Sequence, residues 1–168
     1  MILGMSLSTF VLVHTVISIV AVIAGIVVMF GMLKSTQPGG LTALFLLLTI
    51  LTSATGFLIP PLVSDKLLPS HIIGALSLLL LLIACIALYA MKLTGPWRWI
   101  YALTALLALY FNCFVLVIQS FLKIPALTAI APGNPPSGPV FAVVQGIVLV
   151  FFVLMIIGAI RRFRPVSV

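Results

Sequence analysis

The stretch VFAVVQGIVLVFFVLMIIGAI, residues 140–160, carries no charge and is followed at once by RRFR, residues 161–164. A helix needs about 20 consecutive apolar residues to cross the hydrocarbon core of a bilayer. The stretch meets that length, and a cluster of arginines directly after it is typical of a helix end at the membrane boundary. We therefore interpret it as a transmembrane helix.

Four further apolar runs precede this one, and each ends at a lysine, a proline or a turn sequence. Together they predict an all-α membrane bundle in a single domain, with transmembrane helices at residues 8–33, 41–59, 70–91, 97–122 and 140–160. Pro69 suits the first turn of the third helix because its φ is already helical.

The longest connection, residues 123–139, holds several prolines and cannot be one continuous helix. Its apolar part, residues 125–131, is too short to span. We expect this part to lie on the membrane surface or to cap the bundle.

Composition agrees with a membrane protein. Hydrophobic residues make up 64% of the chain and charged residues 5%, whereas soluble domains have roughly 25% charged residues. The formal charge of +7 comes from cations at the ends of the apolar runs. We interpret these cations as topology signals and contacts to lipid phosphates, not as a nucleic-acid site. Cys85 and Cys113 are expected to be free thiols, because their depths in the membrane differ.

The cations also predict an orientation. Face A receives the chain start and the second and fourth connections, with Lys66 and Lys123. Face B receives the first and third connections and the chain end, with Lys34, Lys92, Arg98, Arg161, Arg162 and Arg164. Cytoplasmic loops are enriched in Lys and Arg, so face B is predicted to be cytoplasmic and the N-terminus to lie outside. Trp97, Trp99 and Tyr101 beside Arg98 indicate an interfacial aromatic belt.

Polar residues within the runs gather in the half of the membrane nearer face A, whereas the other half is nearly pure aliphatic and Phe. The gathered residues are His14, Thr15, Ser18, Thr49, Thr52, Ser53, Thr55, His71, Ser77, Asn112, Gln119 and Gln145. The Ser and Thr hydroxyls are expected mostly to bond back to their own helices. Helical spacing places many of the others on stripes with small residues, which favours close helix packing, and we expect these stripes to face the interior of the bundle. These stripes are His14–Ser18–Ala21–Gly25, Thr42–Thr49–Thr52–Gly56 and Tyr101–Ala105–Ala108–Asn112–Val115–Gln119.

Two kinds of function fit this polar set. The protein is an accessory or structural membrane protein whose polar residues join the helices, or it binds a small apolar ligand, a quinone or a lipid, in a pocket open to the periplasmic half. Such a pocket needs apolar walls with a few hydrogen-bonding groups. The candidate ligand-binding residues are His14, Ser18, Thr52, His71, Asn112, Gln119 and Gln145. A homo-oligomer or a larger membrane complex is compatible with either function.

The alternative is a membrane redox protein with a b-type haem held by His14 and His71. Counting residues along the runs puts these two histidines at depths about 10 Å apart, which is unfavourable for axial ligands of one haem. A passive pore remains a further option. No hydrolase, P-loop or metalloprotease motif is present, so the sequence predicts no catalytic residue and no metal site beyond the haem alternative.

Three stretches resemble small multi-span bacterial inner-membrane proteins of no assigned function: TSATGFLIP at residues 52–60, PSHIIG at 69–74 and YFNCFVLVIQSFLKIPAL at 110–127. The resemblance covers most of the chain. It implies a bacterial inner membrane with face A in the periplasm, and it assigns no role to any residue.

Overall fold

The computed structural model describes residues 2–37, 39–59 and 69–165. Its helices are α1 (Leu7–Leu33), α2 (Gly39–Gly56), α3 (Pro69–Cys85), the π-helical turn η1 (Ile86–Ala90), α4 (Trp97–Lys123), α5 (Pro125–Ile130) and α6 (Pro139–Arg162). Within the described residues, five helices are long and apolar enough to cross a membrane: α1, α2, α3 with η1, α4 and α6. This confirms the prediction of an all-α protein with five such helices.

Local sequence explains where the helices begin and end. Ser6 caps α1 by accepting a hydrogen bond from the backbone N–H of Thr9 at 3.2 Å. Pro69 begins α3, as predicted. The helix predicted for residues 41–59 ends earlier, at Gly56, and residues 57–59 form turns instead. Pro60 follows directly, and a proline disfavours the helical conformation of the residue that precedes it.

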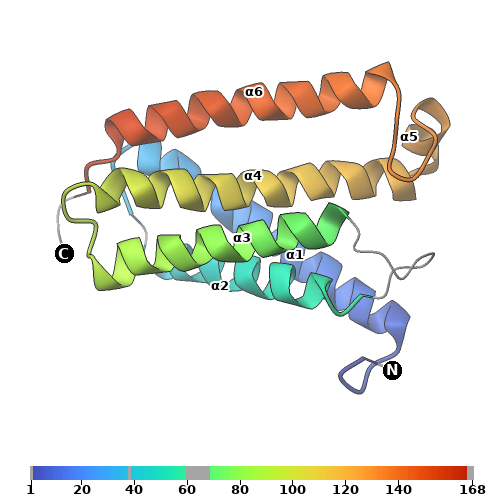
Figure 1. Ribbon diagram of the computed structural model, residues 1–168, viewed down its shortest axis with the longest axis horizontal. Coiled ribbons are helices and arrows are strands. Elements are labelled where there is room, and N and C mark those ends of the chain that lie inside the picture. Colours follow the sequence, from blue (N-terminus) through green and yellow to red (C-terminus); the bar gives the residue numbers. More distant parts are fainter. Residues whose placement is uncertain (1, 38, 60–68, 166–168) are drawn as a thin grey trace.

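The segment 123–139, predicted as a loop, is helical in its first part. Lys123 belongs to α4, and residues 125–130 form the short helix α5, which packs against the end of α4. The hydroxyl of Thr128 donates to the carbonyl of Phe121 at 2.7 Å. In Figure 1, α5 lies across one end of the bundle, the end that also holds the N-terminus and the start of α3. This end corresponds to face A, whereas Lys66 and the rest of the second connection lie outside the described residues.

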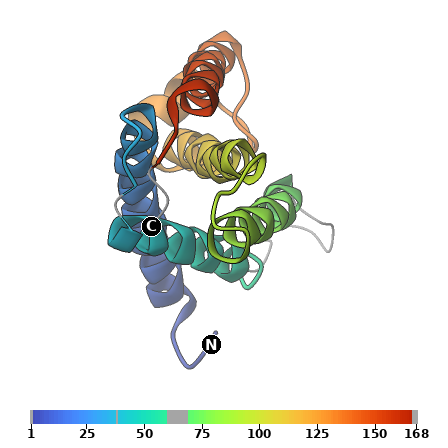
Figure 2. The ribbon, with the colours of Figure 1, turned by 90° about the vertical axis from the view of Figure 1, so that its left-hand side faces the viewer.

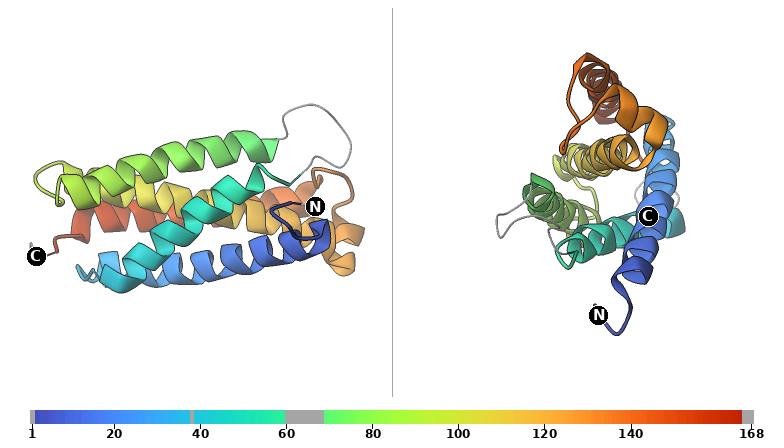
Figure 3. Two further views of the ribbon diagram at one scale, coloured as in Figure 1. Left: turned by 90° about the horizontal axis from the view of Figure 1, so that it is seen from below. Right: turned by 90° about the vertical axis from the view of Figure 1, so that its right-hand side faces the viewer.

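Helix α4 lies at the centre of the arrangement. It contacts α1, α3 and α6 and, to a smaller extent, α2. Figure 2 shows α4 between α6 and α3 when the bundle is viewed from its end, and the views in Figure 3 agree. The last helix, α6, packs on α4 and α1 and leaves most of its surface exposed. The neighbours of α6 therefore come from both the beginning and the middle of the chain.

The apolar core lies mainly in the face B half of the bundle. It takes residues from the second half of α1, the first half of α2, the end of α3 with η1, the first half of α4 and the second half of α6, together with Phe163. Tyr101 was predicted both in the interfacial belt and on an interior stripe, and it is fully buried in this core, as the stripe predicts, while Trp99 remains 43% exposed. Phe163, expected in a basic tail, is also buried, with its ring centroid 5.9 Å from that of Tyr101. The tail folds back because a phenylalanine next to an apolar core gains more from burial than from the interface.

Gly25 allows α1 to approach its neighbours closely. A Cβ atom placed on Gly25 would lie 2.5 Å from a methyl carbon of Leu109 in α4 and 2.7 Å from the ring of Phe45 in α2. Such distances are too short for a real side chain, so only glycine fits without movement of the neighbours. The prediction that the stripe through Ala21 and Gly25 faces the interior is therefore confirmed, since both are buried.

Candidate functional site

His14 of α1 is tied to the end of α2. Its Nδ1 atom lies 2.8 Å from the hydroxyl oxygen of Thr55. That hydroxyl also donates to the carbonyl of Leu51, one turn earlier in α2, at 2.6 Å. The ring edge of His14 also lies beside Gly56, since a Cβ placed on that glycine would be 3.8 Å from the His14 Cε1 atom. His14 thus joins α1 to α2 through a polar contact in the face A half.

His71 of α3 lies on another side of the same helix end. Its ring stacks on Phe57, which follows α2 directly, with centroids 5.5 Å apart and planes 14° apart. Phe57 also packs against Gly74 of α3, since a Cβ placed there would be 3.2 Å from the phenyl ring. Phe57 therefore faces α3, whereas Thr55 faces α1.

Both histidines contact residues at the same end of α2. Thr55, the partner of His14, lies in the last turn of α2, and Phe57, the partner of His71, directly follows the helix. They nevertheless approach α2 from opposite sides, His14 through Thr55 and His71 through Phe57. The end of α2 therefore stands between the two rings, which is unfavourable for a shared haem.

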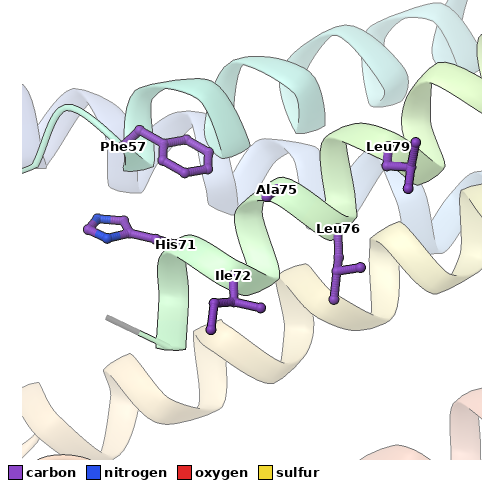
Figure 4. A pocket seen from close by; sticks show the side chains of 6 residues that line it. All are labelled: Phe57, His71, Ile72, Ala75, Leu76 and Leu79. Carbon is purple, nitrogen blue, oxygen red and sulfur yellow. The ribbon is translucent and has the colours of Figure 1, made fainter. Parts of the chain in front are cut away.

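An apolar groove begins beside His71. It has a volume of about 410 Å³ and is lined by Phe57, His71, Ile72, Ala75, Leu76 and Leu79. Figure 4 shows Phe57 and His71 together at one end of the groove, with the aliphatic side chains following along α3. The groove therefore joins an aromatic, partly polar mouth near the face A boundary to an aliphatic wall that runs toward the middle of the bundle.

Several hydroxyls of the predicted polar set form hydrogen bonds within their own helices. Thr15, Ser18, Thr49 and Thr55 each donate to the carbonyl four residues earlier, which confirms that most Ser and Thr bond back. Ser18 thus donates to the carbonyl of His14 at 2.7 Å. Ser53 differs, because it donates to Ser77 across the α2–α3 contact at 3.2 Å. The buried hydroxyl oxygen of Thr52 has no hydrogen-bond partner within the described part of the chain.

The amides are placed differently from one another. The Gln145 side-chain N–H donates to the carbonyl of Phe114 at 3.1 Å, which joins α6 to α4. The Gln145 side-chain oxygen and the Asn112 side-chain nitrogen are both buried without a partner among the described residues. Gln119 is half-buried near the end of α4. Among these three amide side chains, only Gln145 forms a hydrogen bond between helices within the described residues.

The sequence analysis missed two buried hydroxyls in the other half of the bundle. Thr42 and Tyr101 are almost completely buried near face B, where their two hydroxyls lie close enough to interact, although neither forms a hydrogen bond of good geometry within residues 2–37, 39–59 and 69–165. The expectation of a nearly pure aliphatic and Phe half was therefore wrong. Both residues were on the predicted interior stripes, but their depth placed them outside the candidate site.

Across the described ranges, no three His, Cys, Asp or Glu side chains come together as a metal site would require. No family model matches the chain, and neither a curated protein nor a solved structure matches it. Function must accordingly be inferred from the arrangement of this chain's own residues.

Proposed function

We propose that this chain is a multi-pass protein of the bacterial inner membrane that binds a small amphipathic ligand, an isoprenoid quinone or a lipid, in the groove beside His71. The N-terminus is placed in the periplasm and the C-terminus in the cytoplasm. The six-to-two distribution of cations between the faces supports this orientation. The face A half then faces the periplasm.

One observation carries the ligand proposal: an aromatic mouth is continuous with an aliphatic wall along one face of α3. A flat, polar-edged headgroup fits against the stacked rings of Phe57 and His71. An isoprenoid or acyl chain fits along Ile72, Leu76 and Leu79, which recur at helical spacing. A ligand with its polar group near the membrane boundary and its chain directed inward matches the direction of this groove.

The packing asymmetry also supports a ligand in this half. The apolar core lies toward face B, so the helices near face A are held together by fewer buried apolar side chains. Polar contacts such as Ser53 to Ser77 take part there instead. A ligand bound between or upon these helices adds apolar contacts where the protein itself supplies few.

The test is extraction of ligand from protein purified in a native lipid particle. We expect quinone or one lipid class to co-purify in near-stoichiometric amount with the unchanged protein. Leu76→Trp fills the groove and should reduce this amount severalfold. Leu82→Trp is the matched control, because Leu82 is an exposed leucine of the same helix that does not line the groove.

Equal ligand content in both tryptophan variants would contradict the groove. No bound ligand in the unchanged protein would favour the accessory or structural role. An absorbance spectrum of the same sample tests the haem alternative, since a Soret band that is lost in His14→Ala and in His71→Ala would replace the quinone or lipid proposal.

A further inference from the structure

The ends of α1 and α6 meet at face B in a close contact. A Cβ atom placed on Gly158 of α6 would lie 2.9 Å from a methyl carbon of Leu33, the last residue of α1. Beyond the two helices, the backbone N–H of Arg164 donates to the Ser35 hydroxyl at 2.7 Å. Phe163 is buried and holds this segment against the bundle. The residues that follow α1 and α6 are therefore fixed side by side (Figure 2).

This contact brings three exposed cations together. Lys34 is the C-cap of α1, and Arg161 lies in the last turn of α6, three residues after Gly158. Arg164 is joined to the first connection by the hydrogen bond described above. The sequence has a single acidic residue, Asp65, which belongs to the second connection at the other face. An anion that neutralises the three cations must therefore come from outside the chain.

Below its cation, each of the two helices has an exposed apolar stripe. The stripe residues follow one another at steps of three or four residues, which keeps them on the face of the cation. Helix α4 packs on both α1 and α6, so the exposed stripes lie on the side of the α1–α6 contact that faces away from α4. The stripes are Phe30, Val27 and Ile23 below Lys34, and Ile157, Leu154 and Val150 below Arg161.

This arrangement fits a lipid with two phosphates, each of which carries its own chains. Packed helices have axes about 8–10 Å apart, so two phosphates joined by a short bridge can reach the cations of both helices. The chains attached to one phosphate cover the stripe of α1, and those attached to the other cover the stripe of α6. Basic pockets between membrane helices bind the headgroup of cardiolipin, a lipid of this kind. An isoprenoid diphosphate has both phosphates on one chain, which covers one stripe only.

We propose that the α1–α6 contact at face B is a cardiolipin site, with one phosphate at Lys34 and the other at Arg161 and Arg164. The Ser35 hydroxyl accepts from the Arg164 backbone and keeps its own hydrogen, which it can donate to a phosphate. The site requires the proposed membrane setting. It depends neither on the groove beside His71 nor on which face is cytoplasmic.

The test is native mass spectrometry of the purified protein, titrated with cardiolipin and, at equal phosphate, with phosphatidylglycerol. Phosphatidylglycerol has the same type of phosphate but only one per molecule. We expect cardiolipin to bind at least about tenfold more tightly, because one molecule then makes charge-assisted contacts with both helices. Equal affinities for the two lipids would overturn the site.

Two matched variants locate the site. Lys34→Gln removes the cation of α1 and should weaken cardiolipin binding about tenfold, whereas phosphatidylglycerol still finds Arg161 and should change little. Lys92→Gln is the control and should have no effect, because Lys92 is an exposed lysine of the same face that lies in the third connection, outside the α1–α6 contact. Equal losses in both variants would mean that overall charge attracts the lipid, and they would refute the site.

Two further comparisons separate this site from other ligands and from the groove. Geranylgeranyl diphosphate should bind more weakly than cardiolipin, and tighter binding would replace cardiolipin by an isoprenoid diphosphate. Leu76→Trp, which fills the groove beside His71, should leave cardiolipin binding unchanged. A loss of cardiolipin in Leu76→Trp with no loss in Lys34→Gln would place the lipid in the groove and eliminate the site at α1 and α6.

Discussion

Gln145 of α6 donates a hydrogen bond to the backbone carbonyl of Phe114 in α4, across the contact that holds the last helix on the bundle. The same side chain has a buried oxygen without a partner in the described ranges. The amide nitrogen therefore stabilises the contact between α6 and α4, whereas the amide oxygen loses its solvation without gaining a hydrogen bond in return.

We expect Gln145→Leu to change stability little. Hydrogen bonds between membrane helices average about 0.6 kcal/mol, and leucine also removes the unpartnered oxygen. The predicted loss is below about 1 kcal/mol, measured as thermal unfolding in detergent. Gln145→Glu is the comparison. It replaces the donor N–H group by a carboxyl oxygen, and it should lower the thermal stability more than Gln145→Leu does. A larger loss in the leucine variant than in the glutamate variant would refute this account.

Gly25→Val should destabilise the bundle by about 1–3 kcal/mol, the usual cost of overpacking a close contact. The added carbons would meet Leu109 and Phe45 at distances that require both neighbours to move. Gly146→Val is the control, because a Cβ placed on Gly146 meets nothing within 4 Å. Similar unfolding temperatures for the two variants would show that α1 does not approach α2 and α4 as closely as described.

Tyr101→Phe should change stability by less than about 1 kcal/mol, since it removes a buried hydroxyl that interacts with the Thr42 hydroxyl without a hydrogen bond of good geometry. Tyr101→Ala should instead cost about 3–5 kcal/mol through the cavity that it leaves. Both are measured by denaturant or thermal unfolding of the purified protein. A marked loss in the phenylalanine variant would mean that the hydroxyl is bonded after all.

Reporter fusions can test the proposed orientation. A fusion after Val168 should report a cytoplasmic C-terminus, and a fusion at Gly133 should report the periplasm. Replacing Arg161, Arg162 and Arg164 by alanine reduces the cations of face B from six to three, against two at face A. Because this difference sets the orientation, the triple variant should insert in both directions. A periplasmic C-terminus in the unchanged protein would reverse the proposal.

Hydropathy alone predicted the five long helices, because each apolar run is long enough to span and ends at a charge or a proline. It could not predict that Tyr101 and Phe163 are buried together. Both follow or precede cations, which favours an interfacial position, and only the packing of α6 against α4 brings them into the core. Similarly, α2 ends before Phe57 because of the prolines that follow, and this early end allows Phe57 to turn toward α3.

The candidate site was predicted in part. His14 and His71 were identified from their type and depth, and both lie at the face A end of α2. The position of α2 between them depends on how three helices pack. Residue spacing within a single helix cannot predict that packing. The role of Thr55 was missed for the same reason, since a threonine that bonds back to its own helix has the same sequence pattern whether or not a histidine lies beside it.

The peripheral position of α6 has a consequence for biosynthesis. In the proposed membrane setting, helices enter the bilayer in the order of their synthesis, and α6 comes last. Helices α1 to α4 already contact one another without it, through the contacts of α1 with α2, of α2 with α3 and of α3 with α4. A four-helix intermediate can therefore assemble while the ribosome still holds the final segment, and α6 then docks laterally on a surface that α1 and α4 have already formed.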